Sequence, residues 1–131
     1  MKFFDTSFLI DILRKKSDLK DLILSLDEEG PHCTNTIVVH EFFVGGLGSK
    51  NSNAELKVRK DLIHKLIVFP FDIKSAEESS KIENKLRISG ELIGTADILI
   101  AGTMIANDID TILTRNYKHF EKIKGITVQI Y

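Results

Sequence analysis

Residues 1–11 read MKFFDTSFLID, and this stretch decides how the rest of the chain is interpreted. Lys2–Phe4 has the apolar character of a short buried strand, and a helix predicted over Ser7–Lys16 begins three residues later. Between the strand and the helix stands a carboxylate, Asp5. An aspartate at this position can cap the helix, but the two hydroxyl residues that follow it can cap equally well. The cap alone therefore does not explain a charged residue at the end of a buried strand.

The remainder of the chain repeats this alternation of short apolar strands and longer helices. Hydrophobic spacing predicts further helices over residues 18–29, 37–46, 54–65, 73–88 and 96–107, and further strands over 32–34, 67–69, 111–113 and 127–130. Because parallel strands require crossover connections, we expect an α/β fold of three layers, α/β/α, around a central, mainly parallel sheet. No repeat or linker interrupts the pattern, so residues 1–131 are predicted to form a single domain.

Composition narrows the functional classes. The 131 residues are 43% hydrophobic and 28% charged, which is typical of a globular protein, and the net charge of −1 provides no overall basic field for nucleic acid. Cys33 is the only cysteine, so a disulfide framework and a thiolate zinc site are both excluded. Asp5 and Asp11 interrupt the first apolar stretch, which argues against a signal peptide, and no run is long enough for a membrane span. We therefore expect a cytoplasmic protein.

Three carboxylates lack an ordinary surface explanation. Asp5 ends a buried strand, Glu41 lies within the apolar run 37–44, and Asp97 falls in the first turn of an apolar helix. The apolar surroundings of Glu41 lead us to expect that it is at least partly buried, which is costly for an unpaired charge. If the three acids meet, their repulsion favours a divalent cation, and oxygen ligands suit Mg²⁺ or Mn²⁺. Such sites hydrolyse phosphodiesters.

Four motifs, in order along almost the whole chain, resemble the PIN-domain family, and in particular the VapC-type ribonucleases of toxin–antitoxin pairs. They are Asp5-Thr6-Ser7-x-Leu9-Ile10-Asp11, Glu41 with Gly45 after it, Thr95-Ala96-Asp97-x-x-Ile100-Ala101, and Leu113-Thr114-Arg115-Asn116-x-x-x-Phe120. The resemblance implies a metal-dependent endoribonuclease, the toxin of such a pair. It further implies that Asp5, Glu41 and Asp97 bind Mg²⁺, with Mn²⁺ as a substitute.

The same resemblance assigns supporting roles around the metal. Thr6, Ser7 and Thr114 match hydroxyl positions that orient ligands or water. Asn116 stands where many relatives carry a fourth acid, and its amide adds no charge. We therefore expect one firmly bound cation, with any second recruited by substrate phosphate. Glu121 is an alternative source of the missing carboxylate.

Contact with RNA must come from local positive charge, because the chain as a whole is nearly neutral. Arg115 and Lys118 follow the strand end that carries Asn116, so we expect them to contact phosphates. The residues Arg14-Lys15-Lys16 are better explained as cations at the end of a helix. Family resemblance adds two partners, an antitoxin protein that inserts a basic side chain among the acids and a second copy of the chain in a homodimer.

Alternative interpretations differ in the acids they require. A receiver-like signalling domain needs adjacent acids after its first strand, and a phosphatase of the haloacid dehalogenase type needs a second acid at the position of Ser7. A PIN-fold module without catalytic activity has no such requirement. The glycines of Gly45-Gly46-x-Gly48 follow a helix, so we interpret them as a helix stop and not as a phosphate-binding loop.

Overall fold

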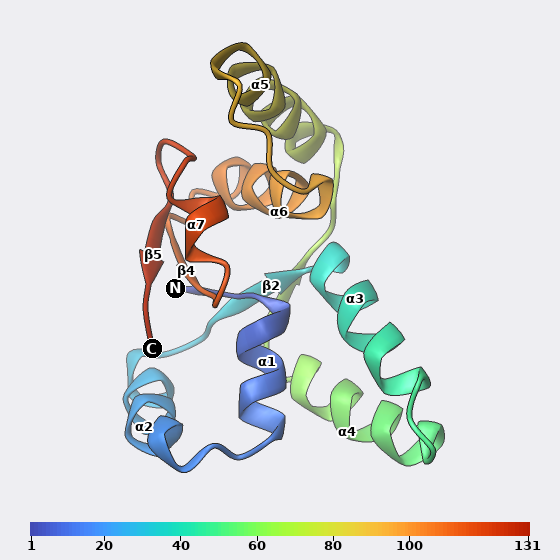
Figure 1. Cartoon of the computed structure of the whole chain (residues 1–131). Coiled ribbons are helices and arrows are strands. Elements are labelled where there is room, and N and C mark those ends of the chain that lie inside the picture. The colour runs from blue at the N-terminus through green and yellow to red at the C-terminus, as the bar shows by residue number, and fades with distance from the viewer.

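A computed structural model describes residues 1–131 and contains one sheet of five parallel strands with helices on both faces (Figure 1). The strands are β1 (Phe3–Phe4), β2 (Cys33–Asn35), β3 (Ile67–Phe69), β4 (Thr111–Leu113) and β5 (Thr127–Gln129). Their order is β3-β2-β1-β4-β5, and every neighbouring pair is parallel. The predicted three-layer α/β/α architecture with a parallel sheet is therefore confirmed.

Seven α-helices cover the sheet. They are α1 (Thr6–Leu13), α2 (Lys20–Glu29), α3 (Thr36–Leu47), α4 (Ser52–Ile63), α5 (Ile73–Ser89), α6 (Thr95–Ala106) and α7 (Tyr117–Phe120). In Figure 1, α5 and α6 lie above the sheet, α1 and α2 lie below it, and α3 and α4 form a hairpin at one end. The sequence did not predict α7, because a single turn is too short to show helical periodicity. None of the helices has the length and apolar character that crossing a membrane requires.

Strand β1 lies at the centre of the sheet, between β2 and β4. Because all the strands are parallel, the segments that follow β1, β2 and β4 emerge at the same edge of the sheet. Ligands bind beyond this edge in open α/β sheets. Receiver domains share the α/β class but have the strand order 2-1-3-4-5. The observed order differs, so the receiver interpretation is wrong.

Helix α6 is held closely against α5 by a glycine. A Cβ atom at Gly102 would lie 2.5 Å from Cβ of Ser79 and 2.8 Å from the backbone oxygen of Ser75, so only glycine permits this approach. Helix α6 is also tied to the sheet, because buried Asn35 of β2 donates a 2.9 Å hydrogen bond from Nδ2 to Oγ1 of Thr103 on α6. These contacts fix α6, and with it the carboxylate in its first turn.

Of the glycines predicted to stop helix α3, Gly48 does so, whereas Gly46 has another role. Helix α3 continues to Leu47 and is capped by Gly48, so Gly46 lies within the helix and does not end it. A Cβ atom at Gly46 would lie 2.8 Å from Cδ of Arg59 on α4. The Arg59 guanidinium lies 4.7 Å from the centre of the Phe42 ring, and Nη1 donates to the Phe42 carbonyl at 2.7 Å. Gly46 therefore makes room for the side chain that joins α4 to α3.

Candidate active site

Asp5 lies at the carboxyl end of β1 and is 3% exposed. It occupies the N-cap position of α1 with an extended backbone, yet its side chain makes no capping hydrogen bond. Its Oδ2 atom instead accepts a 2.5 Å hydrogen bond from Oγ1 of Thr114, which follows β4. The capping explanation for this carboxylate is therefore wrong. Asp5 is oriented by a hydroxyl from the neighbouring strand.

Thr114 is the centre of a short chain of hydrogen bonds. Its own proton goes to Asp5, so in the 3.4 Å contact between Ser7 Oγ and Thr114 Oγ1 the donor must be Ser7. Ser7 Oγ in turn accepts from the backbone N–H of Arg115 at 3.0 Å, and Thr114 Oγ1 accepts from that of Asn116 at 3.0 Å. Two of the three hydroxyls predicted to orient ligands, those of Ser7 and Thr114, thus link the strand ends of β1 and β4.

Glu41 lies on α3 at an exposed position, although its carboxylate is partly desolvated, so the expectation of partial burial holds for the carboxylate but not for the residue as a whole. The position is exposed because α3, although apolar, buries only a narrow stripe, formed by Val38, Phe42 and Gly46. Glu41 lies off this stripe on the side toward α1. There Oγ1 of Thr6 donates to its Oε1 at 3.5 Å.

Asp97 lies in the first turn of α6, as predicted, and its side chain is 13% exposed. Its Oδ2 atom lies 2.6 Å from Nδ1 of His119 on α7. This pairing could not be predicted from the sequence, because α7 itself was not predicted and the two residues are 22 positions apart.

The three carboxylates lie close enough to repel one another. Burial raises the pKa of Asp5, and the nearby Asp97 carboxylate adds to this effect, whereas the hydrogen bond from Thr114 opposes it without cancelling it. Partial desolvation raises the pKa of Glu41, and the charges of Asp5 and Asp97 act in the same direction. No Lys, Arg or His forms an ion pair with Asp5 or Glu41. Two of the three acids, Asp5 and Glu41, therefore have no basic side chain paired with them.

The chemistry of this donor set suits a hard divalent cation. Three carboxylates provide oxygen ligands only, and a cation would relieve the repulsion among them. As the side chains are placed, however, no group of three or more His, Cys, Asp and Glu converges closely enough to hold a metal ion. Asp97 in particular is turned toward His119. Ligation by all three acids would therefore require side-chain rotation.

The remaining predicted site residues follow β4. Asn116 is exposed at the N-cap of α7, and Glu121 is exposed at its C-cap. Lys118 is exposed and forms no ion pair. Arg115 is also exposed, but its Nε atom lies 3.1 Å from Oδ2 of Asp11. Their roles in binding RNA or metal stay predictions.

Asp11 itself was missed by the sequence reasoning. It is a fully buried acid on α1, one turn and a half beyond Asp5. The available signal was a second carboxylate inside the apolar run Phe8–Leu13. Asp11 was used to exclude a signal peptide and as part of the first motif, but an acid so placed also needs buried partners.

Comparisons with known proteins agree with this architecture. The PIN domain family matches residues 2–126. The chain is 33% identical to ribonuclease VapC1 of Methanocaldococcus jannaschii, over 97% of this chain and 84% of that protein. It is 31% identical to ribonuclease VapC1 of Rickettsia felis, over 95% of this chain and 91% of that protein.

Solved structures show the same fold. The structure of DNA-bound VapBC from Salmonella typhimurium contains a chain that superposes with a TM-score of 0.87 at 25% identity, covering 98% of this chain and 96% of that one. VapBC2 from Rickettsia felis, bound to a DNA fragment from its promoter, gives a TM-score of 0.86 at 22% identity, covering 99% and 98%. With a family match across nearly all of its residues and relatives above 30% identity, this chain belongs to the PIN-domain family.

Proposed function

We propose that this protein is an endoribonuclease that uses a divalent cation to hydrolyse RNA phosphodiester bonds, and that it is the toxin of a toxin–antitoxin pair. The observation that carries the proposal is the buried Asp5 carboxylate, whose pKa is raised beside the acids of α3 and α6 and which no cation neutralises. Relatives named ribonuclease VapC1, which match almost the whole chain, support the same activity.

Asp5, Glu41 and Asp97 are the residues proposed to hold the cation, and PIN-domain nucleases generally depend on a divalent metal. Their oxygen atoms favour Mg²⁺, with Mn²⁺ as a substitute. When bound, the cation supplies Lewis acidity and neutralises charge that develops on the phosphate. The protein's own contribution is to fix Asp5 through Thr114 and to keep that carboxylate largely out of water.

Asn116 in place of a fourth acid leads to a prediction about stoichiometry. Its amide oxygen adds no negative charge to the site, so three carboxylates are available for ions. We propose one tightly held cation in the absence of RNA. Isothermal titration of the metal-free protein with Mn²⁺ tests this, because two tight and equivalent sites would contradict it.

Arg115 and Lys118 are proposed to contact the RNA backbone. Both are exposed and follow the strand end that carries Thr114, the residue hydrogen-bonded to Asp5. A phosphate held there would lie beside the carboxylate cluster. Such contacts position the substrate without reading its sequence.

A cleavage assay tests the proposed activity. A structured RNA is incubated with the protein and Mg²⁺ or Mn²⁺, and wild type is compared with Asp5→Asn and Asp97→Asn, with and without EDTA. Cleavage should require the metal and both acids. Asp21→Asn is the matched control, because Asp21 is an exposed acid on α2. Absence of cleavage by the wild type would favour a PIN-fold module without catalysis, and cleavage that survives both substitutions would identify a contaminant.

The proposed partners are an antitoxin protein and a second copy of the chain, acting in the cytoplasm. The solved structures that superpose on this chain include VapBC assemblies, which supports an antitoxin. Val44, Leu47 and Val58 on the α3–α4 hairpin are more than half exposed, so this hairpin offers apolar surface to a partner. Expression of the wild type should arrest growth, whereas expression of Asp5→Asn should not.

A further inference from the structure

A second buried acid, Asp11, lies outside the carboxylate cluster and has a cationic side chain beside each of its two oxygens. It is on α1, and its Oδ2 atom accepts from the Tyr131 hydroxyl at 2.9 Å and lies 3.1 Å from Nε of Arg115. Its other oxygen, Oδ1, lies 3.1 Å from Nζ of Lys16. Three elements of the chain thus converge on one carboxylate: the end of α1, the segment after β4 and the segment after β5.

This arrangement keeps Asp11 ionised. Burial alone would raise the pKa of Asp11, but its contacts with Lys16 and Tyr131 and the charge of Arg115 outweigh burial and lower it. Burial raises the pKa of Tyr131 to about 12, and the Asp11 carboxylate acts in the same direction. The Tyr131 hydroxyl therefore remains protonated and donates to a carboxylate that stays charged.

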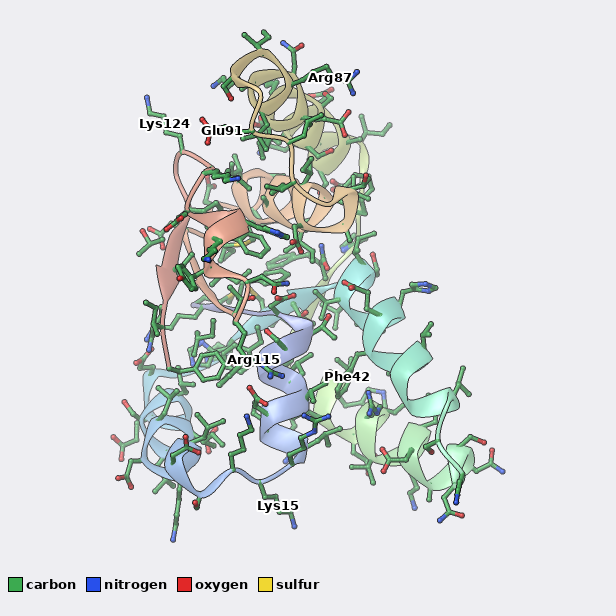
Figure 2. All side chains as sticks on the ribbon, in the orientation of Figure 1. Lys15, Phe42, Arg87, Glu91, Arg115 and Lys124 are labelled. Atoms are coloured by element: carbon green, nitrogen blue, oxygen red, sulfur yellow. The ribbon has the colours of Figure 1, made fainter.

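Arg115 is anchored at two points as a result. Its backbone N–H donates to Ser7 Oγ, which contacts the hydroxyl bound to Asp5, and its Nε faces Asp11. The side chain is nevertheless 49% exposed. Figure 2 shows Arg115 beside α1, near the middle of the molecule and far from Lys124, which lies in the loop before β5. The two Nη groups form no ion pair and remain available for a ligand.

Stability alone is a weak explanation for the Asp11 network. Replacing a buried ion pair by apolar residues of similar volume is often neutral or stabilising. Lys16 already provides a positive charge 3.1 Å from the other carboxylate oxygen, Oδ1. What the second cation adds is a guanidinium held in one orientation, and a guanidinium whose Nε is occupied presents its Nη groups to a phosphate with little further loss of freedom.

We propose that Asp11 is a positioning residue that, with Tyr131, fixes the Arg115 guanidinium so that its Nη groups bind an RNA phosphate beside the carboxylate cluster, an inference that rests on the proposed function. Arg115 is the group that touches the substrate. Asp11 and Tyr131 act only through it. Their effect should therefore disappear when the arginine is removed.

A double-mutant cycle tests this coupling. Steady-state cleavage of one RNA is measured for wild type, Asp11→Asn, Arg115→Gln and the double variant. We expect each single substitution to raise KM about 5- to 20-fold with kcat changed less than about threefold, in line with the loss of one charge-assisted contact. The double variant should have the KM of Arg115→Gln alone. The proposal would be overturned if the two single KM increases multiplied in the double variant, or if the substitutions changed only kcat.

Lys16→Gln provides the matched control. It removes one positive charge and one contact to the same carboxylate, but leaves Arg115 in place. Its KM should stay within about twofold of wild type. A KM increase equal to that of Arg115→Gln would mean that overall charge, and not the orientation of the guanidinium, governs binding, and would overturn the proposal.

Salt dependence separates a phosphate contact from a folding defect. Affinity for a fluorescent single-stranded RNA is measured by anisotropy in the cleavage-deficient Asp97→Asn protein over a range of salt concentrations. The slope of log affinity against log salt is negative, and loss of one phosphate contact makes it shallower by about 0.7. Both Asp11→Asn and Arg115→Gln should show this change. Unchanged slopes in both would overturn the proposal.

Tyr131→Phe serves if Asp11→Asn does not fold. The phenylalanine keeps the ring packed against Phe8, whose ring centre lies 4.8 Å away, and removes only the hydroxyl that donates to Asp11. We expect a KM increase of about two- to fourfold that vanishes in the Arg115→Gln background. A KM identical to wild type would overturn the role of Tyr131 and Asp11. If the wild type neither binds nor cleaves RNA, the proposed function itself is overturned.

Discussion

Asp5 and Asp11 lie six residues apart on the same strand–helix unit, and both are buried, yet their surroundings are opposite. Asp5 has a hydroxyl donor and carboxylate neighbours, and its pKa is raised. Asp11 has an arginine, a lysine and a tyrosine around it, and its pKa is lowered. Burial of an acid therefore does not by itself identify a metal site. The presence or absence of cationic partners within the protein distinguishes the two.

The two carboxylates should contribute to stability with opposite signs. A buried carboxylate without a cation destabilises the fold until a ligand neutralises it, whereas a paired one loses its favourable contacts when it is removed. Substituting the two acids by the uncharged asparagine, which is nearly the same size, should therefore have opposite effects on the metal-free protein.

The largest expected effect is on catalysis by Asp5→Asn. Loss of a proposed metal ligand should lower kcat about 10²-fold or more. The same substitution should raise the Tm of the metal-free protein, because it removes a charge that is buried without a cationic partner while asparagine retains an oxygen that accepts from Thr114. Calorimetric unfolding in EDTA and a cleavage time course measure the two effects. A variant that loses both activity and stability would contradict the distinction drawn between the two acids.

The second effect is on folding by Asp11→Asn. The substitution leaves Arg115 and Lys16 without their carboxylate, and we expect the free energy of unfolding to fall by about 1–3 kcal/mol. Urea unfolding followed by circular dichroism measures it. The control is Asp21→Asn, an exposed site where the change should stay within about 0.5 kcal/mol. Equal stability of Asp11→Asn and wild type would show that the network is unimportant for the fold.

Much of this molecule could be predicted from sequence, and the errors have physical reasons. The strands were found because short apolar runs between helices are readable locally, and Asp5 was found because an acid ends one of them. Glu41 was predicted to be at least partly buried because its helix is apolar, but its position is exposed, and apolar residues of α3 are also exposed, as Val44 shows. Burial depends on what packs against a helix, and this is not a property of the helix itself.

The pairings were the least predictable part of the site. His119 reaches Asp97 across 22 residues, and Tyr131 reaches Asp11 across 120. Such contacts follow from the strand order, which places the segments after β4 and β5 beside α1 and α6, and periodicity carries no information about that order. Single acids are therefore visible in sequence, whereas their partners are not.

The third effect is on stabilisation by metal. Mg²⁺ or Mn²⁺ at about ten times its dissociation constant should stabilise the wild type by about 1.4 kcal/mol, because it binds the folded site only. Asp11→Asn should show the same increase in Tm, since its acid is not a proposed ligand, and Asp5→Asn should show little. Thermal unfolding with and without the cation measures this. An equal increase in all three proteins would place the binding site elsewhere.

The smallest effect is the dependence of stability on pH in EDTA, and the two acids should differ in sign. For Asp5, whose pKa is raised above the ordinary 3.8, the folded state binds more protons than the unfolded state, so its unfavourable contribution grows as pH rises from 3.8 through the raised value. For Asp11, whose pKa is lowered, the favourable contribution is complete above 3.8 and is lost as pH falls through the lowered value.

The Tm of wild type minus that of Asp5→Asn should therefore decrease as pH rises, whereas the Tm of wild type minus that of Asp11→Asn should decrease as pH falls. Unfolding curves for the three proteins between about pH 3 and pH 7 measure both differences. Two differences that change in the same direction would show that the acids share one environment, and that partner cations do not separate a ligand-binding carboxylate from a positioning one.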